Sequence, residues 1–266
     1  MSEIVTLEVI DHIGYVKLNR PEKYNALSIE MFQQLTAMGE KVAKDCSIRV
    51  VVMSGEGKGF CAGLDTGNFE RMAKKEAGAN LFERYHHTPA NMAQQIAYVW
   101  KQVPVPVIAS LHGVAYGGGL QIALATDIRL ASPDLKMSVM EIKWGLIPDM
   151  SISQTLCDLV RLDVAKELTF TGRIVKAAEA AELGLVTRVC DDPMEEARKL
   201  ATVIASKSPD AISKGKQMLE GAWNAGAASG LLLEETLQRD VMGKANQIEA
   251  VMANFEKRDP KFEDRA

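Results

Sequence analysis

A glycine-rich turn is the feature of the sequence that most clearly suggests chemistry. Residues 112–121 read HGVAYGGGLQ, and Gly117, Gly118 and Gly119 stand between an apolar stretch and the start of an apolar helical pattern. Glycine permits backbone angles and close approaches that a Cβ atom would block, and the first N–H groups of a helix have no partner inside it. Such a turn can hold a negative oxygen on main-chain amides alone. A developing oxyanion fits better than a phosphate, because no lysine follows in Walker A spacing.

A second glycine-rich loop follows a predicted strand earlier in the chain. It reads GEGKG over residues 55–59, but the third glycine of a dinucleotide-binding fingerprint would fall at Phe60. The sequence therefore argues against a Rossmann site. The continuation of this loop, AGLD over residues 62–65, offers backbone N–H groups on a flexible turn, as the turn at Gly118 does.

Length, charge and cysteine spacing narrow the class of protein. The 266 residues can bury a full core, and the net charge of −4, with both signs well mixed, argues against a nucleic-acid-binding face. No apolar run reaches the length of a membrane span, and the chain enters an amphipathic strand directly after its first residues, so no signal peptide is expected. The four widely spaced cysteines fit reduced thiols better than disulfides or a zinc site. We expect a cytoplasmic protein that binds neither nucleic acid nor membranes.

Strand, loop and helix patterns recur through the first two-thirds of the chain. Alternating apolar and polar residues predict a β-hairpin at its start, and Ser28 is predicted to cap the helix that follows. Short apolar or alternating runs predict further strands. The predicted strands span residues 4–9, 13–18, 49–53, 104–111, 127–131 and 136–138. The sequence therefore predicts an α/β fold.

Helical patterns dominate the last part of the chain. Ser151 and Gln154 form a capping box for a predicted helix over residues 151–160, and the charged stretch 69–87 predicts a mobile helical segment that covers a pocket. Further helices are predicted over residues 92–101, 177–183, 193–206, 210–228, 231–242 and 247–257. The α/β region should therefore carry a helical C-terminal appendage.

A set of short motifs is spread over essentially the whole chain. They are NRP with NAL in residues 19–27, FCAGLD over 60–65, GVAYGGG over 113–119, DIR over 127–129, ME at 140–141 with GLIP over 145–148, FTG over 170–172, and AAELGLV over 180–186. In this order and spacing the motifs resemble the crotonase family, the enoyl-CoA hydratases and isomerases. Together they are specific for the family but only weakly specific for the reaction.

The resemblance implies a fold, a substrate class and an assembly. The fold would be a crotonase-like spiral of ββα units, with a core domain over residues 1–200 that carries the acyl-CoA site. A helical trimerisation region would occupy residues 201–266, where apolar residues such as Leu231, Leu232 and Leu233 suggest subunit contacts. The substrate would be an acyl-CoA thioester, so coenzyme A is part of the substrate and no separate cofactor or metal is expected. The assembly would be a homotrimer or a hexamer made of two trimers.

The resemblance also implies roles for the two glycine turns. The backbone N–H groups of Leu64 and Gly118 would form an oxyanion hole for the thioester oxygen. The α-proton of a thioester is too weakly acidic for an unaided carboxylate, and one such amide donor is typically worth about 3 kcal/mol. The residues expected to bind substrate or coenzyme A are Lys23, Tyr24, Ala62, Leu64, Asp65, Gly117, Gly118 and Lys257. Lys257 would come from a neighbouring subunit, although Lys23 and Lys257 could equally be solvated surface charges.

Three side chains bear on the reaction. Hydratases of the family use two glutamates, but here the first position is Gln121 and only the second is kept, as Glu141. Hydration needs two proton-carrying groups, and an amide cannot exchange a proton with water at neutral pH. Moving a double bond needs only one base. Asp149, eight residues after Glu141, resembles the second carboxylate of dienoyl-CoA isomerases, although those enzymes usually carry an acid at the Gln121 position too.

We therefore expect an isomerase of fatty acid metabolism, of the β-oxidation type, with 3-enoyl-CoA or 3,5-dienoyl-CoA as substrate. A 2-enoyl-CoA hydratase and a non-catalytic acyl-CoA-binding paralogue are the alternatives. Each side chain also has a structural explanation. Gln121 could be a buried amide bonded to the backbone, Glu141 a helix-start carboxylate, and Asp149 the cap of the helix predicted over residues 151–160.

Overall fold

The computed structural model describes residues 3–65, 67 and 80–266, which contain two β-sheets. Within the described residues, the larger sheet has six strands in the order β1-β2-β3-β4-β6-β9, and the smaller has three in the order β5-β7-β8. The β1–β2 and β7–β8 pairs are antiparallel, and the other neighbours are parallel. The strands are β1 (Val5–Ile10), β2 (Ile13–Leu18), β3 (Val50–Gly55), β4 (Val107–Leu111), β5 (Val114–Tyr116), β6 (Ile128–Ala131), β7 (Lys136–Ser138), β8 (Val175–Lys176) and β9 (Arg188–Val189).

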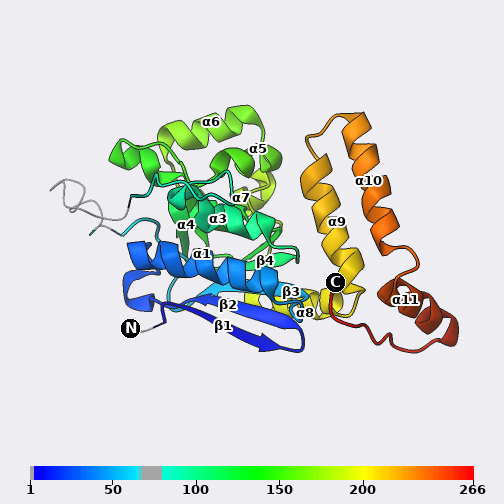
Figure 1. The fold of residues 1–266 in the computed structure, drawn as a ribbon. Coiled ribbons are helices and arrows are strands. Elements are labelled where there is room, and N and C mark those ends of the chain that lie inside the picture. The colour runs from blue at the N-terminus through cyan, green and yellow to red at the C-terminus, as the bar shows by residue number, and fades with distance from the viewer. Residues whose placement is uncertain (1–2, 66, 68–79) are drawn as a thin grey trace.

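Helices cover both faces of the larger sheet and make up the C-terminal part of the chain (Figure 1). The α-helices are α1 (Ile29–Lys44), α3 (Met92–Gln102), α4 (Gly118–Leu124), α5 (Leu156–Leu159), α6 (Leu162–Thr171), α7 (Ala177–Leu183), α8 (Pro193–Ala205), α9 (Pro209–Ala222), α10 (Ala227–Val241) and α11 (Ala245–Glu256). Three short 3-10 helices are also described: η1 (Pro21–Lys23), η2 (Met140–Trp144) and η3 (Ile152–Gln154).

Strand β3 is buried on both faces, which explains its continuous run of apolar residues. Successive side chains of a strand point to opposite sides, so Val51 and Met53 join the cluster that α1 and α3 cover, whereas Val50 and Val52 pack against α8. Helix α8 contributes a stripe of alanines spaced four residues apart, Ala197, Ala201 and Ala205. Their small side chains let α8 lie close to the sheet.

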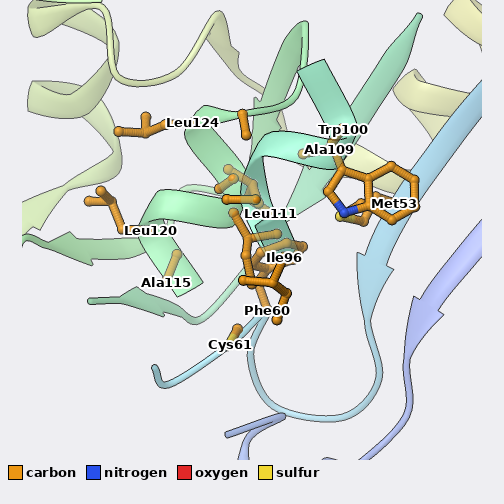
Figure 2. Packing of buried hydrophobic residues seen from close by; sticks show 14 of the residues in the cluster. Met53, Phe60, Cys61, Ile96, Trp100, Ala109, Leu111, Ala115, Leu120 and Leu124 are labelled. Carbon is orange, nitrogen blue, oxygen red and sulfur yellow. The ribbon is translucent and has the colours of Figure 1, made fainter. Parts of the chain in front are cut away.

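The main core lies between β3, β4, α3 and α4, where large side chains are completely enclosed. Figure 2 shows Trp100 of α3 beside Met53 and Ala109, and Ile96 near Phe60 and Leu111, all within one cluster. Full burial of side chains of this size stabilises by roughly 2 kcal/mol each. The strand end and the helix start that flank the glycine turn are thus fixed on a rigid, close-packed base.

The last three helices extend away from the sheets (Figure 1). Helices α9 and α10 pack against each other, and α9 is tied to the core by Lys216, whose Nζ donates to the carbonyl oxygens of Trp100 and Val105 and pairs with Asp127 at 2.8 Å. Helices α10 and α11 present apolar side chains to solvent, and Leu231 is 64% exposed and Phe255 80% exposed. No helix within residues 3–65, 67 and 80–266 is long and apolar enough to cross a membrane.

Several sequence predictions are confirmed by these elements. The N-terminal hairpin forms, the Ser28 side chain accepts a hydrogen bond from the Met31 N–H, and the helix predicted over residues 177–183 has those limits. The strand predicted from residue 104 begins only at Val107, because Pro104 and Pro106 have no N–H group for a sheet. The predicted division between residues 200 and 201 passes through α8.

Two helix predictions need correction. The capping box at Ser151 is wrong, because Ser151 has a left-handed backbone (φ 62°), whereas an N-cap needs an extended one, and only the short helices η3 and α5 form there. Of the stretch 69–87, residues 69–79 lie outside the described residues. Residues 80–87 form turns and a bridge from Arg84 to Asn91 instead of a helix.

Candidate active site

The two glycine turns lie side by side. Residues 61 and 115 form a parallel bridge, with the Cys61 N–H donating to the Val114 carbonyl and the Tyr116 N–H donating to the Cys61 carbonyl. Gly63 has a left-handed backbone (φ 87°), and a Cβ atom there would lie 2.6 Å from the Tyr116 carbonyl oxygen and 3.5 Å from the Gly118 nitrogen. Only glycine fits this contact, which brings the Leu64 and Gly118 backbones together.

The backbone amides of Leu64 and Gly118 are available for a ligand. Gly118 is the first residue of α4, and neither its N–H nor that of Leu64 donates to an acceptor among the described residues. The neighbouring Gly117 N–H is taken, because it donates to the Ser138 carbonyl. A Cβ atom at Gly118 would lie 2.6 Å from Leu27 Cδ1 and 2.7 Å from the Met150 sulfur, so a larger residue here would require these side chains to move.

Glu141 turns its carboxylate inward against the glycine turn. It lies on η2, just after β7, and its Oε1 would be only 3.2 Å from a Cβ atom at Gly117. Oε1 accepts a 2.6 Å hydrogen bond from Gln121 Nε2, while Oε2 is buried with no partner among the described residues. Burial raises the pKa of Glu141, the charge of Asp149 raises it further, and the hydrogen bond from Gln121 opposes the rise.

Gln121 connects Glu141 to the segment that carries Asp149. It projects from α4 and is only 1% exposed. Its Nε2 donates to Glu141, and its Oε1 accepts a 2.8 Å hydrogen bond from the Met150 N–H. The expectation that Gln121 bonds the backbone is confirmed at one end of the amide, and the other end contacts the carboxylate.

Asp149 lies at the outer side of this group. Its residue is exposed, yet partial loss of hydration raises the pKa of its carboxyl group. The structural explanation of Asp149 as a helix cap is not supported, because η3 begins after Ser151 and has no side-chain cap. The charge of Asp149 contributes to the raised pKa of Glu141, after the larger effect of burial.

Asn25 is a positioning residue that sequence reasoning did not single out. Its side chain is fully buried, and its Nδ2 donates to the carbonyl oxygens of Gly59 and Phe60. Its Oδ1 accepts from the Arg20 N–H, so Asn25 joins the loop after β2 to the loop that carries Leu64. The available signal was its type, since asparagine accepts the left-handed backbone found here (φ 55°).

Asp65 is held by structural partners. Its carboxylate pairs with Arg20 and accepts from the Gly67 N–H. Although burial raises it, the Gly67 N–H and the Arg20 guanidinium hold the pKa of Asp65 below its usual value. Asp65 therefore stabilises the loop around Leu64, whatever else it contacts.

The remaining predicted binding residues are split between two regions. Lys23 and Tyr24 are exposed on the loop after β2, and the Ala62 N–H donates to the Tyr24 carbonyl, so these three lie together beside Leu64. Lys257 ends α11, which in Figure 1 lies far from α4, so it does not join the site of its own chain. Among the described residues, no three His, Cys, Asp or Glu side chains are grouped so as to hold a metal ion.

Comparisons with known proteins identify the family of the chain. The profile of the enoyl-CoA hydratase/isomerase family matches residues 8–265. The chain is 32% identical over 266 residues to the probable enoyl-CoA hydratase echA8 of Mycobacterium bovis, covering 99% of both chains. It is 33% identical over 256 residues to the mitochondrial Delta(3,5)-Delta(2,4)-dienoyl-CoA isomerase of Mus musculus, covering 94% of this chain and 78% of the mouse protein. A crystal structure of an enoyl-CoA hydratase from Bacillus anthracis matches with a TM-score of 0.87 and 30% identity, over 98% of this chain and 99% of that one.

Proposed function

Because the chain belongs to the enoyl-CoA hydratase/isomerase family and has its crotonase fold, we propose that it moves a carbon–carbon double bond within a fatty acyl-CoA thioester. The environment of Glu141 supports this proposal best. One oxygen of its buried carboxylate accepts from the Gln121 amide, which cannot carry a proton, and the other has no partner among the described residues. A single base suffices to take a proton from one carbon and return it to another.

The first step of the proposed reaction is enolate formation. The thioester oxygen would accept from the Leu64 and Gly118 N–H groups, and Glu141 would take the proton from the carbon next to the carbonyl. Amides fixed before the reaction stabilise the developing charge without reorganisation. The raised pKa of Glu141 suits this role, because a base is most effective when its pKa lies near the working pH.

The second step returns a proton further along the chain. For a 3-enoyl thioester, protonated Glu141 would deliver the same proton to the other end of the dienolate, and the double bond moves into conjugation. For a 3,5-dienoyl thioester the acceptor carbon is more distant. Asp149, whose pKa is also raised, would then act as the second proton carrier. The similarity to the mouse dienoyl-CoA isomerase supports this longer substrate.

Hydration of a 2-enoyl thioester is the second candidate, because relatives of equal similarity are named hydratases. In that reaction Asp149 and Glu141 would have to activate water and deliver the α-proton without a carboxylate at position 121. We expect a Gln121→Glu variant to gain hydratase activity relative to isomerase activity, because it restores the second proton carrier. A variant whose ratio of products stays unchanged would argue against this division of roles.

Incubation with 2-enoyl, 3-enoyl and 3,5-dienoyl thioesters tests the proposal directly. We expect double-bond movement to be faster than hydration, a loss of all activity in Glu141→Gln, and a loss confined to the dienoyl substrate in Asp149→Asn. Faster conversion of the 2-enoyl thioester to a hydroxyacyl product would reject the isomerase. Exchange of the α-proton with deuterated solvent that depends on Glu141 would exclude a mere binding protein.

The coenzyme would lie along the exposed loop formed by Lys23, Tyr24 and Ala62. We propose that Lys257 reaches this loop only from a neighbouring subunit, in a homotrimer or a hexamer, since α11 lies far from its own site. Light scattering that found only monomers would contradict this assembly.

A further inference from the structure

Two lysines face each other across the smaller sheet. Strands β7 and β8 pair antiparallel with Lys136 directly opposite Lys176, so both side chains project from the same face. Their neighbours on the other face, Met137 and Val175, are completely buried, so the lysines point outward. Like charges placed directly opposite in a sheet are destabilising, and no acidic side chain of the described residues forms an ion pair with either lysine.

A third lysine belongs to the same place. Lys58 lines one cavity of about 350 Å³ together with Lys136 and Lys176. The cavity reaches the backbone of Gly113 and Val114, where the Lys58 carbonyl packs so tightly that a Cβ atom at Gly113 would lie 2.1 Å from it. The backbone of Lys58 is thereby fixed beside the row formed by Val114, Lys136 and Lys176.

The charge in this cavity is unbalanced. Three lysines line it against one acidic residue, Asp134, whose carboxylate already accepts from the Ser132 hydroxyl. The glycine turn and Glu141 follow the opposite ends of β5 and β7. Tyr116 and Ser138 pair at that end, two residues beyond Val114 and Lys136 and so roughly 7 Å along the sheet. The two ends of the β5–β7–β8 sheet therefore present different sites.

We propose that Lys58, Lys136 and Lys176 form a binding site for a polyvalent phosphate, such as a diphosphate group. A multiply charged oxyanion would relieve the repulsion across the β7–β8 pair and accept from several ammonium groups at once. The cavity exceeds the size of a single phosphate and suits two linked phosphates or a phosphorylated small molecule. The site is independent of the reaction at Glu141, so its test does not require activity.

Calorimetric titration with inorganic pyrophosphate tests the site. We expect saturable binding of one pyrophosphate per chain that weakens with rising salt. Lys136→Gln and Lys176→Gln should each weaken it by about tenfold or more, while Lys166→Gln on α6, an exposed lysine outside the cavity, should not. Absence of saturable binding, or equal weakening in Lys166→Gln, would overturn the proposal.

Thermal unfolding gives a second measurement that also controls for folding. Without pyrophosphate, the Lys176→Gln variant should unfold at or slightly above the wild-type temperature, because one partner of the like-charge pair is gone. Pyrophosphate should raise the midpoint of the wild type but not that of the Lys136→Gln, Lys176→Gln double variant, and an equal rise in both would overturn the site. Competition by coenzyme A but not by pantetheine would overturn the independence of this site from the coenzyme loop around Lys23. Undisturbed pyrophosphate binding would point to a separate phosphorylated compound.

Discussion

Replacing Gln121 by leucine should move the pH dependence of the reaction. The Gln121 amide donates a 2.6 Å hydrogen bond to Glu141 Oε1 and thereby opposes the rise in the Glu141 pKa that burial causes. A hydrogen bond to a charged group contributes about 1.5–3 kcal/mol. Losing this hydrogen bond in the variant should therefore raise the pKa of Glu141 further.

The sign of this shift determines what is measured. Glu141 acts as a base only when ionised, so the acidic limb of the kcat/KM profile should move to higher pH in Gln121→Leu, while activity well above the new pKa falls much less. A general loss of function would lower the whole profile instead. Double-bond movement, or α-proton exchange in deuterated solvent, followed across pH gives both quantities.

A matched control is available in Gln95 of α3. Gln95 is also buried, accepts from the Thr88 hydroxyl and donates to Gln102, but it does not contact Glu141. Gln95→Leu should lower stability, as Gln121→Leu also should, because each leaves buried polar groups unpaired. Only Gln121→Leu should shift the acidic limb. An unmoved limb in that variant, or an equal shift in Gln95→Leu, would refute the role given to Gln121.

Three further variants test other parts of the structure. Glu141→Gln should unfold at a higher temperature than the wild type at neutral pH, because ionisation of a carboxyl group with a raised pKa costs stability as the pH rises. Thermal melts across pH should show this advantage vanish below about pH 4.5, the ordinary pKa of glutamate. Gly63→Ala should lose roughly 1–3 kcal/mol of stability in urea unfolding, together with activity, because its left-handed backbone and the Tyr116 oxygen 2.6 Å away exclude a Cβ atom. Lys216→Met should cost about 3–5 kcal/mol, because Asp127 loses its ion-pair partner and keeps only the hydrogen bond from the Val107 N–H, and two carbonyl oxygens lose their donor. If combining it with Asp127→Asn costs as much as the two single changes added together, the pair is not coupled.

Local signals in the sequence were enough for elements whose cause is local. The Ser28 cap and the hairpin depend on residues within one turn or one strand pair, and both were predictable. Strands β8 and β9, with two residues each, carry no period that a sequence could display. The capping box at Ser151 failed because the fold gives that residue a left-handed backbone, which its sequence neighbours do not announce.

The candidate site also combines features that local sequence predicts with features that only the fold explains. From the sequence alone, Gln121 shows only that a carboxylate is missing at this position. That argues against hydration but does not say what the amide group does. In the fold, α4 sets that amide between Glu141 and the Met150 N–H, two groups 20 and 29 residues away in sequence. Both ends of Gln121 are then occupied by the protein, so it is poorly placed to orient water as a hydratase residue would. Glutamate at this position would put a second negative charge against Glu141 and lose the donor that holds it. The glutamine at position 121 therefore both weakens the case for hydration and supports Glu141 as a single, fixed base.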